Sequence, residues 1–187
     1  MVYIDEHIGD FSLQAALAEI SEQRRKQALS FKFEQGQRTC VLAYLLLKKA
    51  LREEYGIAEN PLFEYGPHGK PFIVGHPEIH FNLSHCREAV ACAVSSRPVG
   101  IDVESVRQYK EDIVHYAMND EEQQLIAAAE RPDVAFIRLW TMKEARLKLT
   151  GEGITVDLKS ALDGGPWQFT TVERLDRHYV YTVCEEE

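Results

Sequence analysis

Three acidic residues and one lysine are the side chains of this sequence that are best suited to phosphate chemistry. Two of the acids, Asp102 and Glu104, stand in Gly100-Ile101-Asp102-Val103-Glu104, whose letters alternate as on a strand. Alternate strand residues share one face, so the two carboxylates should lie side by side. A proton, a basic residue or a divalent cation must offset their repulsion. Magnesium suits such a pair when it also binds a substrate phosphate. A solvated strand end is the plainer alternative.

The third carboxylate, Glu144, lies in the segment 140–148, whose letters are WTMKEARLK. On a helix, Glu144 and Lys148 are four residues apart and share one face. A surface ion pair between them, contributing about 0.3–0.5 kcal/mol, is the plainer interpretation. Against it, the helix runs directly into the segment 151–153 (Gly-Glu-Gly), whose flexibility suits a lid or a binding loop.

The segment 81–85, with the letters FNLSH, predicts a strand that ends in a hydroxyl and an imidazole. Phe81 and Leu83 alternate inward, and Ser84 and His85 offer a pair of donors for a phosphate. A Ser-His hydrolase is a second interpretation. It is weakened because a nucleophilic serine beside its own base would be poorly placed, and because no GxSxG motif is present. A histidine with a purely structural role is a third interpretation.

Two further basic features could meet phosphate. In the segment 69–71 (GKP), glycine permits a tight turn, Lys70 offers a point charge and Pro71 fixes the exit of the chain. An ordinary turn with a solvated lysine is the alternative. The basic cluster 24–26 is expected on a helix, where a solvated helix face is again the alternative.

A mixed set of helices and strands must position these residues. Apolar residues at three- to four-residue spacing predict helices, and short apolar runs between Gly, Pro and His predict strands. Helices are expected over residues 11–20, from Ser21 onward, 38–51, 110–117, 120–129 and 132–149, and strands over 2–4, 62–65, 71–74, 79–83, 89–94, 99–103, 167–172 and 178–183. The last two strands are expected to pair antiparallel. This order predicts the α+β class, with a midpoint boundary at Arg97-Pro98.

Composition restricts the class of protein further. The chain has 187 residues, 45% of them hydrophobic, which is enough for one sizeable core or for two small halves packed as one body. A net charge of -9 argues against a general nucleic-acid role, which needs a cationic surface. It does not argue against a locally basic phosphate pocket.

Compartment and redox state follow from other features. The start of the chain has no apolar signal core, and the longest apolar run, residues 40–47, is too short to span a bilayer. The cysteines form no CxxC pair and fit no zinc-binding spacing; they are Cys40, Cys86, Cys92 and Cys184. Free, mostly buried thiols are expected. These features predict a cytoplasmic protein.

Four motifs in a fixed order carry a family resemblance: GKP at 69–71, FNLSH at 81–85, GIDVE at 100–104 and WTMKEARLK at 140–148. In this order and with these gaps, the sequence resembles the 4'-phosphopantetheinyl transferases, of the larger type that works as a pseudo-dimeric monomer. The resemblance implies two similar α+β halves, residues 1–98 and 99–187, related by a pseudo-twofold. They would form a single functional unit, with coenzyme A in the cleft between them and the metal ligands in the C-terminal half.

The resemblance also implies roles in catalysis. Asp102, Glu104 and Glu144 match the magnesium ligands of the family, with manganese as the alternative ion, and Lys148 matches the lysine near the pyrophosphate of coenzyme A. A carrier-protein serine would attack the phosphopantetheine-side phosphorus, and adenosine 3',5'-bisphosphate would leave. We expect Lys148 to stabilise the developing charge. Glu144 is the expected base, directly or through a metal-bound water.

Further residues match the coenzyme A contacts of the family. Asp102 and Lys148 are expected to contribute to coenzyme A binding at its pyrophosphate. The residues that hold phosphates or lie beside the nucleotide are Ser84, His85, Lys70 and Pro71. Arg25 matches less closely a basic residue that binds the 3'-phosphate, and Arg24 is a rival for that role.

The implied partners are coenzyme A and an acyl or peptidyl carrier protein, with no nucleic acid and no membrane, and we expect a monomer. Because such carriers are usually acidic, we expect a hydrophobic contact with a few local basic residues. The segment 151–165, which meets the carrier in this family, is short here. The alternatives are a non-catalytic coenzyme A-binding protein and a magnesium-dependent phosphohydrolase. The latter leaves the GKP and NLSH motifs unexplained.

Overall fold

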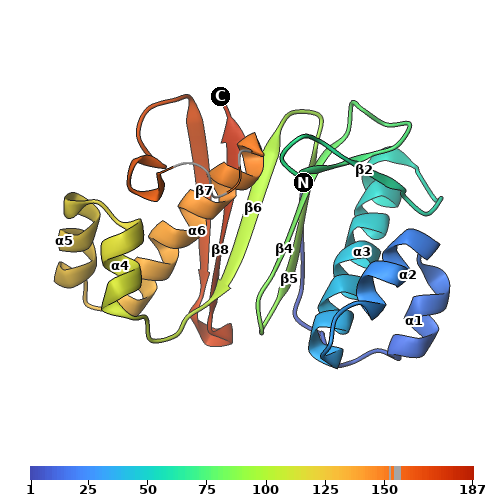
Figure 1. Cartoon of the computed structure of the whole chain (residues 1–187), viewed down its shortest axis with the longest axis horizontal. Coiled ribbons are helices and arrows are strands. Elements are labelled where there is room, and N and C mark those ends of the chain that lie inside the picture. Colours follow the sequence, from blue (N-terminus) through green and yellow to red (C-terminus); the bar gives the residue numbers. More distant parts are fainter. Residues whose placement is uncertain (152, 154–156) are drawn as a thin grey trace.

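Two three-stranded antiparallel sheets lie side by side at the centre of the computed structural model, which describes residues 1–151, 153 and 157–187 (Figure 1). The first sheet has the strand order β1-β5-β4 and the second has the order β6-β8-β7, while β2 and β3 form a separate hairpin. The strands are β1 (Val2–Asp5), β2 (Phe63–Tyr65), β3 (Pro71–Ile73), β4 (His80–His85), β5 (Val90–Ser95), β6 (Val99–Ser105), β7 (Trp167–Arg174) and β8 (Tyr179–Glu186).

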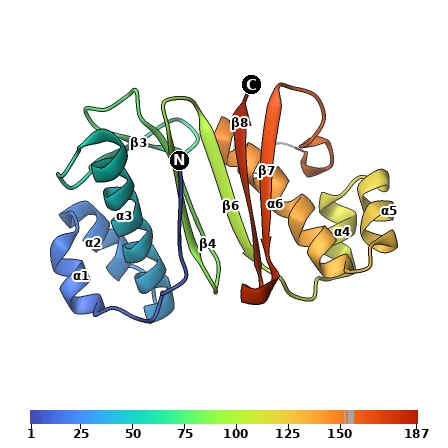
Figure 2. The same cartoon turned by 180° about the vertical axis from the view of Figure 1, so that it is seen from behind.

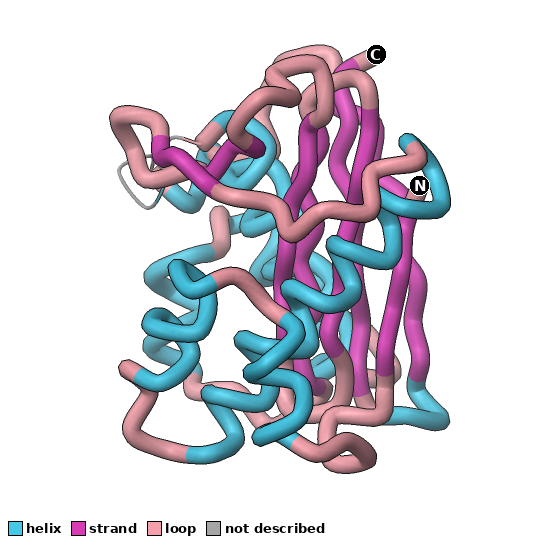
Figure 3. The backbone as a smooth tube through the Cα atoms, turned by 90° about the vertical axis from the view of Figure 1, so that its right-hand side faces the viewer, coloured by secondary structure: helices cyan, strands magenta, loops and turns pink. Residues whose placement is uncertain are grey.

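Helices flank the two sheets, α1 to α3 beside the first and α4 to α6 beside the second (Figures 1 and 2). They are α1 (Leu13–Glu19), α2 (Glu22–Leu29), α3 (Glu34–Tyr55), α4 (Glu111–Ala117), α5 (Asp120–Ala128) and α6 (Pro132–Thr150), with the short helices η2 (Leu158–Ser160) and η3 (Leu175–Arg177). In the side view the strands of the two central sheets run along one direction (Figure 3). Within the described residues, no helix combines the length and the apolar character needed to cross a bilayer. The predicted α+β class and the predicted pairing of the last two strands are confirmed.

Local sequence signals set the ends of several helices. The Ser21 hydroxyl accepts the backbone N–H of Arg24 at 3.2 Å and caps α2. Pro132 is the first residue of α6, and Gly151 follows the helix in the left-handed conformation, with a φ of 74°. α3 extends beyond the predicted 38–51 at both ends, because its exposed polar ends continue a helix whose buried part alone carries the apolar pattern.

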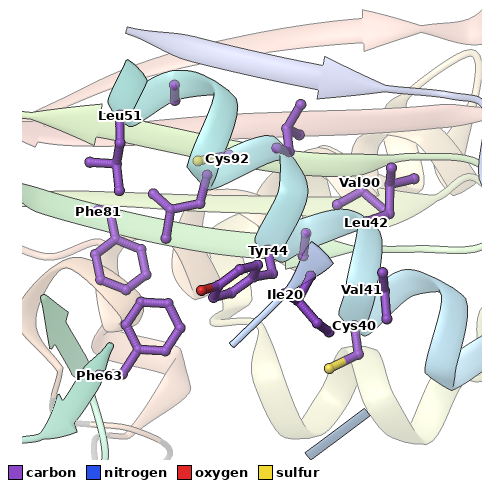
Figure 4. Close-up of a cluster of buried hydrophobic side chains, with 14 of the residues drawn as sticks. Ile20, Cys40, Val41, Leu42, Tyr44, Leu51, Phe63, Phe81, Val90 and Cys92 are labelled. Carbon is purple, nitrogen blue, oxygen red and sulfur yellow. The ribbon is translucent and has the colours of Figure 1, made fainter. Parts of the chain in front are cut away.

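The first sheet packs against α3. Tyr44 of α3 meets Phe63 edge-on with ring centroids 5.9 Å apart, and Phe63 stacks on Phe81 of β4 at 5.3 Å (Figure 4). The buried Tyr44 hydroxyl donates to the carbonyl of Pro61 at 2.9 Å. All four cysteines are free and three are buried, as predicted. This core holds β4, the strand that carries the FNLSH motif.

β4 and β6 lie next to each other where the two sheets meet, although among the described strands each forms its backbone ladder with a different neighbour. Side chains of β4 bridge the junction instead. The backbone N–H of Ile101 donates to Asn82 Oδ1 at 3.0 Å, and that of Val103 donates to Ser84 Oγ at 3.2 Å. These bonds hold the part of β6 that contains Asp102 against the first sheet.

α6 lies very close to β6. A Cβ atom on Gly100 would stand only 1.9 Å from the carbonyl oxygen of Ala145, so glycine is required there. Thr141 of α6 and Thr182 of β8 share a buried hydrogen bond of 2.8 Å between their hydroxyls. The close approach brings the last turns of α6 beside Asp102.

Candidate active site

Asp102 is the centre of the candidate site. The residue is only 3% exposed, and its Oδ1 accepts hydrogen bonds from Lys148 Nζ at 2.6 Å and from Ser84 Oγ at 2.8 Å. Its other oxygen, Oδ2, is buried and has no hydrogen-bond partner among the described residues. A buried carboxylate oxygen without a partner is costly and is therefore a candidate ligand for a cation.

Lys148 reaches this carboxylate from the last turn of α6. Its Nζ forms the ion pair with Asp102 and also donates to Ser84 Oγ at 3.0 Å, and its side chain is 29% exposed. The sequence had left open a surface pair between Lys148 and Glu144. The structure joins Lys148 to β6 instead, across the junction of helix and sheet.

Glu104 and Glu144 line the same cavity as Asp102 and Lys148, with a volume of about 310 Å³. Burial and then the Asp102 carboxylate raise the pKa of Glu104 from 4.5 to about 7. The same two causes raise the pKa of Glu144, and Lys148 opposes that increase. The cavity brings together more carboxylates than cations, which favours the binding of an added positive charge.

A second cavity, of about 220 Å³, shares Glu144 and Lys148 with the first. Lys70 and Pro71 of the GKP motif line it. Lys70 Nζ donates to the Leu149 carbonyl at 2.6 Å, and burial lowers the pKa of this lysine. The GKP motif therefore meets the WTMKEARLK helix at this cavity.

The predicted lid segment 151–153 also borders the second cavity. Gly151 and Gly153 line it, while Glu152 lies outside the described residues. A Cβ atom on Gly151 would lie 3.2 Å from the Lys70 side chain, so the end of α6 contacts the GKP turn. Of the longer segment 151–165, expected to meet the carrier, residues 152 and 154–156 lie outside the described residues.

His85 reaches the first cavity from the other sheet, and the two candidate arginines lie on α2. The exposed His85 side chain lines this cavity, and desolvation by the surrounding protein lowers the pKa of its imidazole. The charge of Arg24 acts on His85, and the Arg24 guanidinium donates to the Cys40 carbonyl at 2.9 Å. Arg25 instead donates to the Leu17 carbonyl at 2.8 Å. The charge of the rival candidate Arg24 thus acts on a residue of the site.

The predicted metal ligands share one cavity but do not form a closed coordination shell. Among the described residues, no group of three or more His, Cys, Asp or Glu side chains is arranged to hold a metal ion. Asp102, Glu104 and Glu144 nonetheless line a single cavity, and one buried oxygen of Asp102 has no hydrogen-bond partner in the described part of the chain. An open arrangement of this kind suits an ion that also takes water and substrate oxygens.

Several side chains that the sequence did not single out support the site. Asn82 lines the second cavity and Trp140 the first. Lys143, directly before Glu144 in the chain, is fully buried; its Nζ lies 2.7 Å from Glu122 Oε1 and donates to the Leu158 carbonyl at 2.8 Å. The sequence offered little indication that Lys143 is buried, because lysine side chains are normally exposed.

Comparisons with known proteins point to one family. The model of the 4'-phosphopantetheinyl transferase superfamily matches residues 98–186. The chain is 38% identical over 144 residues to the 4'-phosphopantetheinyl transferase psf-1 of Bacillus pumilus, covering 75% of this chain and 62% of that protein. It is 32% identical over 188 positions to gsp of Aneurinibacillus migulanus (98% and 76%), and 26% identical over 162 to Sfp of Bacillus subtilis strain 168 (85% and 72%).

These matches define the class of the protein. The chain belongs to the 4'-phosphopantetheinyl transferase superfamily, as its motifs predicted. The proteins named in the three matches are all 4'-phosphopantetheinyl transferases. The match spans less than two thirds of the Bacillus pumilus protein and about three quarters of the other two.

Proposed function

We propose that this chain is an enzyme that transfers the 4'-phosphopantetheine moiety of coenzyme A to a serine of an apo acyl or peptidyl carrier protein. The serine oxygen bonds to the phosphopantetheine-side phosphorus, and the bond from that phosphorus to the bridging oxygen breaks. Adenosine 3',5'-bisphosphate leaves, and the serine proton passes to a base. The observation that carries this proposal is that Ser84, Asp102 and Lys148, from three separate elements, meet at one cavity.

Asp102, Glu104 and Glu144 would hold a magnesium ion, with manganese as the alternative. The support is that the buried Oδ2 of Asp102 has no partner within residues 1–151, 153 and 157–187, and that carboxylates outnumber cations around the cavity. Hard oxygen ligands with room for water and phosphate are what magnesium prefers. When bound, the ion supplies positive charge to the pyrophosphate.

Lys148 and Glu144 lie where the two cavities meet and are our candidates for the chemical step. The Lys148 ammonium would stabilise negative charge that develops on the leaving phosphate oxygens. Glu144 would accept the proton of the attacking serine. In the metal-free site, burial raises the pKa of this carboxyl, which makes its carboxylate a stronger base than an exposed one.

The remaining contacts hold coenzyme A. We assign the nucleotide to the cavity beside Lys70 and Pro71, and the 3'-phosphate to His85 and Arg24. Arg24 is preferred to Arg25 because its charge acts on His85, whereas Arg25 is bonded to α1. A cation and an imidazole are suitable donors to a phosphate.

The proposal also covers how the chain is divided into two halves. We infer two halves, residues 1–98 and 99–187, related by a pseudo-twofold and acting as one unit. The support is that each half contributes a three-stranded sheet with three helices beside it, and that β5 passes to β6 through Arg97-Pro98. We also propose a cytoplasmic monomer, consistent with four free cysteines.

Intact-protein mass spectrometry tests the function. A panel of apo fatty-acid, polyketide and nonribosomal-peptide carriers would be incubated with the protein, coenzyme A and magnesium. The expected result is a gain of one phosphopantetheine mass on at least one carrier, lost with EDTA and with Asp102→Ala. No gain on any carrier, together with measurable coenzyme A binding, would favour the non-catalytic binding protein. Full activity of Asp102→Ala would refute the metal assignment.

A further inference from the structure

Three threonines of the second half are joined through their hydroxyl groups. Thr141 of α6 and Thr182 of β8 are both 0% exposed, and their hydroxyl oxygens lie 2.8 Å apart. Thr182 Oγ1 also lies 2.9 Å from the hydroxyl oxygen of Thr171 on β7. In the register of the sheet, Thr182 pairs with Thr171 on one side and with Asp102 on the other, so these side chains share one face. The three threonines, the threonine network, therefore lie on the same face of the sheet as the central carboxylate of the candidate site.

The direction of each hydrogen bond in the threonine network follows from one contact. The Thr141 hydroxyl donates to the Arg138 carbonyl at 3.0 Å, because a carbonyl oxygen can only accept. Since each hydroxyl has one proton, Thr182 must donate to Thr141, and Thr171 must donate to Thr182. The buried proton of Thr182 is thus committed to an acceptor on α6, and a shift of the helix along the sheet would stretch that bond.

α6 lies across the second sheet and meets it at points spaced four and three residues apart, which fall on one helix face (Figure 1). The points on the helix are Thr141, Ala145 and Lys148, and their partners in the sheet are Thr182, Gly100 and Asp102. The Thr141 contact lies two helical turns, about 10 Å, before the Lys148 contact. Neither Thr141 nor Thr182 lines either cavity of the candidate site, so this contact can be changed without removing a group of the site.

We propose that the threonine network is a positioning device, in which the bond from Thr182 to Thr141 fixes where α6 lies along the sheet. The helix in turn carries Glu144 and Lys148 to Asp102. Apolar packing holds a helix on a sheet but is not directional, whereas a hydrogen bond weakens steeply when its geometry is disturbed. Misplacing a reacting group by about 1 Å lowers a rate by about 10²-fold, so a small shift of α6 matters for catalysis. This catalytic part of the inference rests on the proposed function.

Isosteric variants separate positioning from stability. Thr141→Val leaves the buried Thr182 proton without its acceptor, which is costly, whereas Thr182→Val removes that proton. The double variant, Thr141→Val with Thr182→Val, replaces the bond by an apolar contact of the same shape and should recover most of the thermal stability that Thr141→Val loses. Thr170→Val is the control, because it removes an exposed hydroxyl from the neighbouring residue of β7, on the other face of the sheet.

The first test needs no enzyme activity and follows the ¹³Cγ resonance of the Asp102 carboxylate by nuclear magnetic resonance. Its value in the unsubstituted protein marks the intact ion pair, and its value in Lys148→Met marks the lost pair. In the double variant the resonance should move at least about half of the way to the Lys148→Met value, and in Thr170→Val it should not move. An unmoved resonance in the double variant, or equal values in the unsubstituted protein and Lys148→Met, would overturn the proposal.

The second test measures transfer to the apo carrier that the protein modifies. In the double variant kcat should fall about tenfold with little change in the KM for coenzyme A, while thermal stability stays near that of Thr170→Val. Thr182→Ser, which keeps the hydroxyl, should retain most of the activity. If kcat in the double variant equals that of Thr170→Val, the threonine network is only structural and the positioning role is overturned. If the double variant does not fold, Thr182→Val takes its place in both tests. If the unsubstituted protein transfers nothing, the proposed function fails, and the first test alone decides whether the network places α6.

Discussion

Two lysines of α6 each pair with a carboxylate, and their surroundings differ. The Lys143 side chain is 0% exposed and its partner Glu122 is 8% exposed; Nζ also bonds the Leu158 carbonyl, and Glu122 accepts the Asn119 N–H at 2.8 Å. Each charged atom of this first pair has at least one partner. The second pair, Lys148 with Asp102, lies beside a cavity, with the lysine 29% exposed and one carboxylate oxygen without a partner among the described residues.

The difference separates a structural ion pair from one suited to chemistry. A closed buried pair cannot exchange its partners without leaving a charge unpaired, so it fixes α5 and η2 on α6. An open pair beside a cavity can give up one contact to a substrate or an ion. The two lysines are five positions apart in the chain, and their environments distinguish them.

The largest effect on stability is expected from Lys143→Ala. It leaves Glu122 buried without its cation, and breaking a buried pair costs about 3–5 kcal/mol of unfolding free energy. Urea unfolding followed by circular dichroism measures this loss. Lys143→Met combined with Glu122→Gln removes both charges and keeps an acceptor for the helix cap, so it should recover part of the stability. Stability equal to that of the unsubstituted protein in Lys143→Ala would contradict the closed-pair interpretation.

Lys148→Ala should reduce activity strongly and stability less. Turnover should fall about 10²–10³-fold, as for the loss of a group that stabilises transition-state charge. Stability should fall less than in Lys143→Ala, because water reaches the Lys148 side chain. Steady-state kinetics with varied coenzyme A would separate kcat from KM. If KM alone changes, Lys148 is a binding residue only.

The open site also predicts a pH dependence of stability. The pKa of Glu104 is about 7 in the folded protein and 4.5 ordinarily, so the folded state holds a proton that the unfolded state loses between these values. The contribution of Glu104 to stability is therefore fully present below pH 4.5 and is lost as pH rises through 7. Without added metal, Glu104→Gln should stabilise the protein at pH 8 by about 1–3 kcal/mol and should have little effect at pH 4. Thermal unfolding at both pH values measures the difference; equal shifts at both would refute it.

The smallest effect is expected from an exposed pair. Lys26 and Glu22 of α2 form an i,i+4 contact of 2.8 Å with side chains 77% and 76% exposed. Lys26→Ala should change the unfolding free energy by about 0.5 kcal/mol or less and should leave turnover unchanged. This variant is the control for removing a lysine side chain that is neither buried nor beside the cavity. A loss near that of Lys143→Ala would show that burial does not govern these pairs.

Part of the fold could be predicted because its signals are local. Ser21 and Pro132 mark helix starts through backbone chemistry that needs only the next few residues. The predicted helix over 38–51 was shorter than α3. A hydrophobic pattern indicates only the buried part of a helix, whereas the helix itself continues through exposed polar residues.

The sequence by itself determined the class of chemistry: strand alternation puts Asp102 and Glu104 on one face, and four-residue spacing does the same for Glu144 and Lys148. Only the tertiary structure decided which groups meet. Lys148 pairs with Asp102, 46 residues away, and Ser84 turns toward Asp102 across the junction of the sheets. Such contacts depend on how close α6 and β4 come to β6. That distance is set by packing at positions such as Gly100, which no local pattern encodes.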